Sequence, residues 1–140
     1  MHEALANLID KEHARRKEAS RFAKAAKPFI ADLNRELSSI LTQYRKEFPD
    51  DGKIAERRVL QNGLRLEIKR LPDGPTCDVL ADCVHRVLRV RHDNQEPITV
   101  TVGYDKENAL VLAIGDPTIS AFASGVIAPI LFPELMEIDG

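Results

Sequence analysis

The sequence predicts an α+β fold: a long kinked N-terminal helix packed on a five-stranded antiparallel meander, with a short C-terminal helical cap. Apolar residues recur three or four positions apart over residues 2–48, with one gap at Lys11–Glu18, and this is the spacing of one helix face. Apolar and polar residues alternate between residues 54 and 116, as in half-buried strands. The 140 residues, 44% of them hydrophobic, suffice for one domain with its own core. We divide that domain into a helical extension (1–27), a helix on the sheet (28–48), the antiparallel sheet (54–116) and the helical cap (117–138).

The helical pattern continues in phase through Pro28, although proline removes one backbone donor and crowds the preceding turn. We therefore expect one kinked helix rather than two. Residues 2–48 would span about 70 Å as a helix, whereas the rest of the chain would form a body only about 30 Å across. The part before Pro28 must fold back, project or pack on another subunit. We favour a subunit contact, because Ala19, Ala23 and Ala26 would let a second helix approach closely.

Asn62-Gly63 stands between two alternating runs and predicts a hairpin, because a type I′ turn needs positive φ at both central residues. This turn places Arg58 opposite Glu67 and Glu56 opposite Lys69, two pairs of opposite charge that stabilise a sheet by roughly 0.2–1 kcal/mol each. A slip by one residue would bring like charges together. The other face carries the apolar residues Val59, Leu64, Leu66 and Ile68, with Arg57 as its one charged member.

The later strands are delimited by weaker signals. Cys77–His92 is largely apolar at odd and even positions, which predicts one long third strand that is covered on both faces or bulged near Cys83. Ile98–Tyr104 alternates as a fourth strand, and a loop at Asp105–Asn108 would pair Val102 with Val111 in a fifth. That register leaves an apolar row that the C-terminal segment or a second subunit must cover. The row consists of Leu110, Leu112 and Ile114.

The cap begins where Asp116-Pro117 combines a favoured N-cap residue with proline at the first helical position. We expect this helix to reach about Ser124 and to end at Gly125. A broken helical tail should follow around Pro129 and Pro133.

Cys83 and His85 are the side chains most suited to metal or nucleophilic chemistry. On one strand face they would lie roughly 7 Å apart, so a shared zinc ion is geometrically conceivable. Structural zinc needs four ligands, however, and Cys77 would lie about 20 Å from Cys83 along the strand. A nucleophilic Cys83 with His85 as base would need an exposed thiol with a depressed pKa, which an apolar strand disfavours. We predict buried thiols, a hydrogen-bonded histidine, and no catalytic residue, metal or cofactor.

Charge is unevenly distributed, although the net charge is only −2. Lys11–Lys27 holds seven basic and two acidic residues, a local +5, whereas the chain from Asp105 onward holds six acids and one lysine, a local −5. Helical spacing gathers Lys17, Arg21 and Lys24 into one cationic strip, which could meet phosphates or an acidic membrane surface. The strip could equally be a solvated helix face, or bind the acidic C-terminal region of the same chain or of another.

The location we expect is the cytoplasm. No secretory signal is visible, no apolar run approaches the roughly 20 residues that span a bilayer, and two cysteines are too few for a disulfide scaffold.

The function we predict is a non-enzymatic, homo-oligomeric binding or adaptor module, with a protein as the possible partner. The alternatives are a nucleic-acid-associated protein that uses the basic helix, and a small-ligand or catalytic pocket between helix and sheet. The predicted binding residues are Lys17, Arg21 and Lys24. The predicted oligomer contacts are Ala19, Phe22, Ala23, Ala26, Leu110, Leu112 and Ile114.

Overall fold

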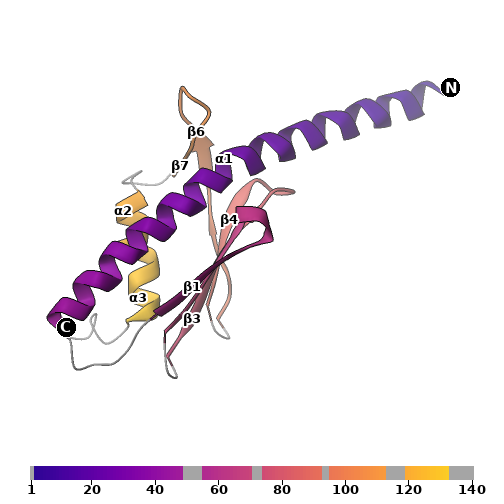
Figure 1. Ribbon diagram of the computed structural model, residues 1–140. Helices are drawn as coiled ribbons and strands as arrows, with labels where there is room; N and C mark the ends of the chain where they lie inside the picture. Colours follow the sequence, from indigo (N-terminus) through magenta and orange to yellow (C-terminus); the bar gives the residue numbers. More distant parts are fainter. Residues whose placement is uncertain (1, 49–54, 71–73, 93–94, 113–118, 133–140) are drawn as a thin grey trace.

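One helix, α1 (Glu3–Glu47), runs the length of the molecule and packs on an antiparallel sheet in the computed structural model (Figure 1). The structure describes the chain except residues 1, 49–54, 71–73, 93–94, 113–118 and 133–140. The predicted α+β fold is confirmed: a long N-terminal helix, a five-stranded antiparallel sheet and a short helical segment after it. Pro28 lies inside α1 without interrupting it. Proline has no N–H, so the Lys24 carbonyl lacks its usual intrahelical partner; Lys24 and Pro28 are both exposed residues.

The first hairpin has the predicted register. Strands β1 (Ala55–Leu60) and β2 (Arg65–Arg70) pair so that Arg58 faces Glu67 and Glu56 faces Lys69. Between them the short turn η2 (Gln61–Gly63) has φ 57° and ψ 34° at Asn62 and φ 91° at Gly63, which are the angles of a type I′ turn. The Leu64 N–H donates to the Gln61 carbonyl at 3.1 Å and closes it.

The predicted single strand over Cys77–His92 is wrong. The stretch forms a hairpin of two strands, β3 (Thr76–Asp82) and β4 (Val87–His92). With β5 (Ile98–Val100) they complete a sheet ordered β1-β2-β3-β4-β5. The Asp82 carboxylate accepts the Val84 and His85 N–H groups at 3.1 Å each, and Arg86 takes φ 56°. The Asp82 side chain thus forms a turn that reverses the chain without glycine or proline. The sequence did not reveal this turn, because apolar residues continue through it at both odd and even positions.

The next expected strand, Ile98–Tyr104, is also divided. Its first part is β5 (Ile98–Val100), which pairs with β4, and its second part is β6 (Val102–Tyr104), which pairs with β7 (Leu110–Leu112) in a small second sheet. Val102 faces Leu112, so the predicted pairing of Val102 with Val111 is wrong by one residue.

The loop before β7 explains this register. The Asp105 carboxylate accepts the N–H groups of Glu107 at 2.8 Å and Ala109 at 2.9 Å, and Asn108 takes φ 62°, so the loop holds one residue more than expected. Leu110 and Leu112 are consequently buried in this chain's own core, 6% and 9% exposed, instead of forming an outward row. Ile114 lies outside the described residues.

The last described segment is helical from Ile119 to Leu131: α2 (Ile119–Phe122), the π-helical turn η3 (Ala123–Ile127) and α3 (Ala128–Leu131). The expected end at Gly125 is wrong, because Gly125 lies within the π turn and Pro129 opens α3. A π turn widens the helix just ahead of the proline ring, where an α turn would clash with it. The expected cap at Asp116-Pro117 and the expected break at Pro133 lie outside the described residues.

The core lies between the sheet and two helical segments, α1 and the stretch from α2 to α3, which sit side by side over one sheet face (Figure 1). The Phe29 and Phe122 rings meet at 6.3 Å, and the Tyr44 ring stacks on Phe132 at 4.4 Å. Arg70 donates to the Leu131 carbonyl at 3.0 Å and ties α3 to β2. The part of α1 that contributes to this core begins at Phe22, six residues before Pro28.

Candidate functional site

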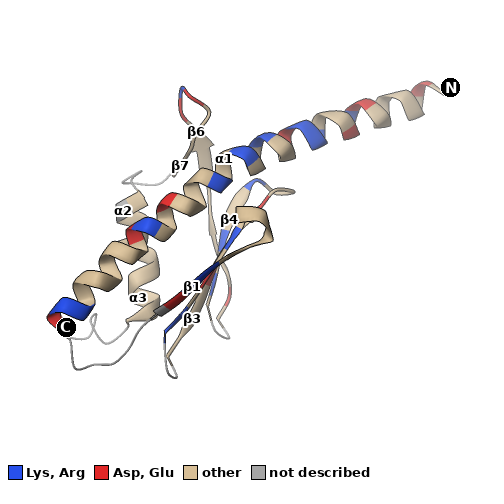
Figure 2. Ribbon diagram, in the orientation of Figure 1, with Lys and Arg blue, Asp and Glu red and all other residues tan. Residues whose placement is uncertain are grey.

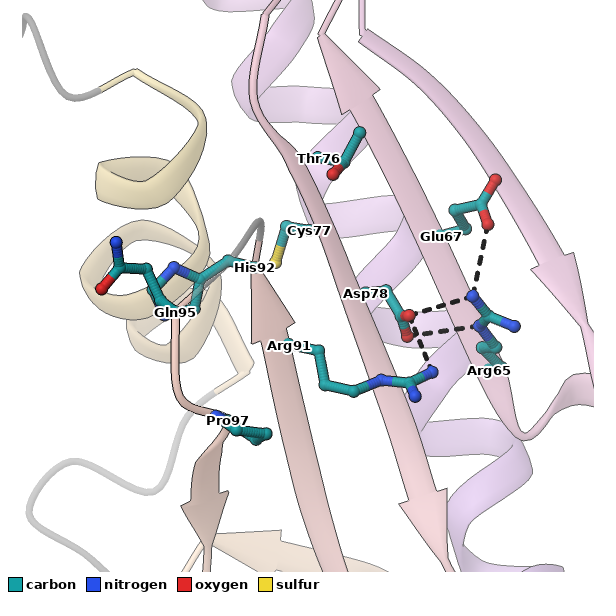
Figure 3. Close-up of a pocket in the computed structure, with 9 residues that line it drawn as sticks. All are labelled: Arg65, Glu67, Thr76, Cys77, Asp78, Arg91, His92, Gln95 and Pro97. Atoms are coloured by element: carbon teal, nitrogen blue, oxygen red, sulfur yellow. Dashed lines mark hydrogen bonds and ion pairs between the residues drawn. The ribbon is translucent and has the colours of Figure 1, made fainter.

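The sheet face away from the helices carries a lattice of ion pairs. Asp78 accepts two bonds from the Arg65 guanidinium, at 3.2 and 3.0 Å, and one from Arg91 at 2.9 Å (Figure 3). Glu67 is shared between Arg58 at 2.7 Å and Arg65 at 3.4 Å. A cavity of about 430 Å³ opens beside this lattice. Each of the two carboxylates, Asp78 and Glu67, is therefore held by two guanidinium groups, as charge-assisted pairs of this kind commonly are.

A second cluster surrounds the β3–β4 turn. Asp82 accepts bonds from His85 Nδ1 at 2.9 Å and Arg89 Nε at 2.8 Å, and Arg89 continues to Thr99 at 3.2 Å. Burial alone would raise the pKa of Asp82, but the hydrogen bonds from Arg89 and His85 outweigh it and hold that pKa well below its usual range. The imidazole itself points to solvent, with its side chain 65% exposed.

The two cysteines do not join this cluster in a reactive arrangement. Cys83 and His85 sit on a turn, so the strand geometry assumed for a shared zinc ion is wrong. Burial raises the pKa of the Cys83 thiol, and the Asp82 charge adds to the rise, whereas a nucleophile needs a lowered pKa. Cys77 is 1% exposed. Within the described part of the chain, no three His, Cys, Asp or Glu side chains gather closely enough to hold a metal ion.

The predicted cationic strip lines a groove. Lys17, Arg21 and Lys24 face the loop between β6 and β7 across a cavity of about 660 Å³, near the middle of α1, where basic residues follow one another along the helix (Figure 2). Arg21 is anchored there, because it donates to the Asn108 side chain at 2.9 Å and lies 4.0 Å from the Tyr104 ring centroid. The groove also contains Glu18 and Glu107, so both signs of charge line it.

The outer part of α1 forms a fourth candidate, a surface rather than a pocket. Residues 3–16 project from the body (Figure 1), and none of them is buried. Three large apolar side chains stand out on this segment: Leu5 is 49% exposed, Leu8 62% and Ile9 39%. They lie at helical spacing on one side of α1, where exposed apolar groups mark an interaction surface.

The residues predicted as oligomer contacts divide between core and surface. Phe22 and Ala26 are fully buried in this chain's own core, as are Leu110 and Leu112, so these four present no apolar surface to a partner. Ala19 and Ala23 are half-buried on α1 and stay candidates. Leu5, Leu8 and Ile9 belong to the apolar helical pattern of residues 2–48 but were not among the predicted oligomer contacts. Their helical spacing can be recognised in the sequence. The sequence does not show which stretch of the helix the rest of the chain covers.

Comparisons with known proteins add no family: protein-family models, curated proteins and solved structures all yield no match to this chain. Among the described helices, none is long and apolar enough to cross a membrane.

The Asp82 cluster generates a prediction of pH dependence. Replacing Asp82 with asparagine keeps an acceptor for the turn but removes the charge that Arg89 and His85 contact, and should lower the free energy of unfolding by about 1–3 kcal/mol at pH 7. A group whose pKa is lowered by folding stabilises above its unfolded pKa, so the difference should shrink as the pH falls below about 4. Urea unfolding at several pH values measures it, with the exposed Asp10→Asn as the matched control. A difference that persists unchanged at pH 2.5 would contradict the assignment.

Proposed function

We propose that this chain is a non-enzymatic binding module that self-associates through the projecting segment of α1. The observation that carries the proposal is the exposure of Leu5, Leu8 and Ile9 on a helix segment outside the body. Fully burying one such side chain contributes about 1.5–3 kcal/mol. A partner that covers all three would therefore supply several kcal/mol without changing the fold.

Chemistry at the charged clusters supports a non-enzymatic role. Asp78 and Asp82 are each held by arginine, and the Cys83 thiol has a raised pKa. The third alternative, a ligand pocket between helix and sheet, is disfavoured because Ile30, Leu33 and Leu66 fill that layer with no exposed surface. We also propose a cytoplasmic location, where cysteines stay reduced; both cysteines of this chain are thiols.

Light scattering coupled to gel filtration tests the proposal. At tens of micromolar the wild type should exceed the 15.7 kDa of one chain and approach at least twice that mass. The triple variant L5A/L8A/I9A should return to the mass of one chain, because alanine keeps the helix but removes the apolar surface. The matched variant E3A/N7A/D10A changes three exposed polar residues of the same segment and should associate like the wild type. A wild type of one-chain mass at this concentration would refute the proposal.

A second candidate function is association with nucleic acid. The observation in its favour is that Lys17, Arg21 and Lys24 line one groove. Against it stand the two glutamates of that groove and the contacts that already occupy Arg21. A phosphate backbone would meet repulsion from the glutamates and would compete with Asn108 for the guanidinium. We therefore rank this function second.

Salt dependence separates the two functions. We expect wild-type affinity for duplex DNA or RNA at physiological salt to be no tighter than the non-specific range of about 10⁻⁴–10⁻⁶ M. If the groove did bind phosphates, the variant K17E/R21E/K24E would flatten the salt slope by roughly three units. The variant R35E/R45E/K46E makes the same change in net charge at exposed positions of the same helix but outside the groove. Salt-sensitive binding at nanomolar protein that only the groove variant abolishes would place nucleic acid first.

A further inference from the structure

We propose that the partner of the projecting helix is the same segment of a second copy of this chain, packed antiparallel and centred on Ala14. This inference rests on the proposed function, because it specifies the partner and the register of that association. It is carried by the order of residues along one side of α1.

The side of α1 that packs on the sheet continues beyond the body. Starting from the core and moving toward the N-terminus, residues at alternating steps of three and four stay on one side of the helix. The buried members, which we call the inner stripe, are Ala26, Ile30, Leu33 and Leu37. The continuation, which we call the outer stripe, is Leu5, Ile9, Glu12, Arg16, Ala19 and Ala23. None of the outer stripe is buried, whereas Ala26, the next residue in the series, has no exposed surface. On this stripe full burial therefore ends between Ala23 and Ala26, whereas Phe22, on the adjacent side of the helix, is still buried.

The outer stripe is complementary to itself when reversed. Turning a second copy end for end about the level of Ala14 brings Leu5 against Ala23 and Ile9 against Ala19. Large side chains then meet small ones, which lets two helices approach closely. The central pair is Glu12 against Arg16, of opposite charge. By two-fold symmetry each of these contacts occurs twice.

Other registers fail on charge or on size. In a parallel pair, Glu12 would meet Glu12 and Arg16 would meet Arg16, and like charges in contact are destabilising. Centring the antiparallel pair on Glu12 would bring the two copies of that residue together. A shift of seven residues toward the tip would set Leu5 against Arg16 and Ile9 against Glu12. A shift of seven the other way would set Leu5 against Ile30, which has no exposed surface.

The neighbouring side chains are compatible with this pairing. Leu8 immediately precedes Ile9 and lies on the edge of the same surface. Arg16 already contacts Glu12 of its own helix at 3.1 Å, so the two-fold axis would bring two such pairs into one network. The cationic strip takes no part in this pairing, because Lys17, Arg21 and Lys24 line the groove beside the β6–β7 loop. Charged residues at the middle of the stripe also argue against a lipid surface as the occupant, since they would have to enter the apolar layer.

Cysteine cross-linking tests the register in the full chain. The double variant L5C/A23C, made with C83S, should give a disulfide-linked dimer under mild oxidation, because both engineered pairs lie in contact. The single variant L5C with C83S is the matched control and should give none, since the two Leu5 positions would be about 27 Å apart. Efficient cross-linking of the single variant would overturn the antiparallel arrangement. A wild-type dimer in light scattering with no cross-link in the double variant would overturn this register and leave the proposed function standing.

Charge exchange at the centre supplies a second readout that does not depend on oxidation. The variant E12R should weaken dimerisation by about tenfold, because two attractive contacts become repulsive. The variant E12R/R16E restores opposite charges across the interface and should recover most of that loss. Circular dichroism of each variant controls for helix content. Failure of the double variant to recover, with helix content intact, would contradict the Glu12–Arg16 pairing.

Discussion

The apolar side of α1 is the constraint on which the rest of this structure depends. Phe22, Ile30 and Leu33 are fully buried under the sheet, and the segment from α2 to α3 packs beside them through Phe29 and Tyr44. Neither the sheet nor the short helices could bury their apolar faces without α1. The same helix continues beyond the body over residues 3–16, where Leu5 and Ile9 are exposed to solvent. One continuous helix thus lies partly in the core and partly in solvent.

The sequence could predict features in which a local rule and a global pattern agree. At the first hairpin, Asn62-Gly63 sets the turn while Arg58–Glu67 and Glu56–Lys69 demand the same register, and the structure has that register. The prediction failed at turns that are formed by an aspartate side chain and not by glycine or proline. Asp82 reverses the chain between β3 and β4, and Asp105 lengthens the next loop by one residue. A shift of one residue in a strand exchanges its faces, so the expected outward row of Leu110 and Leu112 became core.

The candidate interaction surface was only half predictable for a related reason. Helical spacing alone predicted which residues share one side of α1, among them Ala19 and Ala23. It could not show where the body ends, because that depends on how the sheet and the C-terminal helices fit together. Phe22 and Ala26 were therefore taken as contacts although the body covers them, and Leu5 and Ile9 were omitted although they are exposed. The charged clusters have a different role: Asp78 and Asp82 bind the arginines of β2 and β4 and give the outer sheet face its own cross-strand ties.

Amide hydrogen exchange at several protein concentrations tests the central claim most directly, namely that one helix is divided between core and interface. Amides of residues 30–37 should be strongly protected at every concentration, because they open only with the body. Amides of residues 3–16 should exchange rapidly in dilute solution and become protected as the concentration rises through the dimerisation range. Exchange in residues 3–16 that stays equally fast, or equally slow, over that whole range would contradict the account.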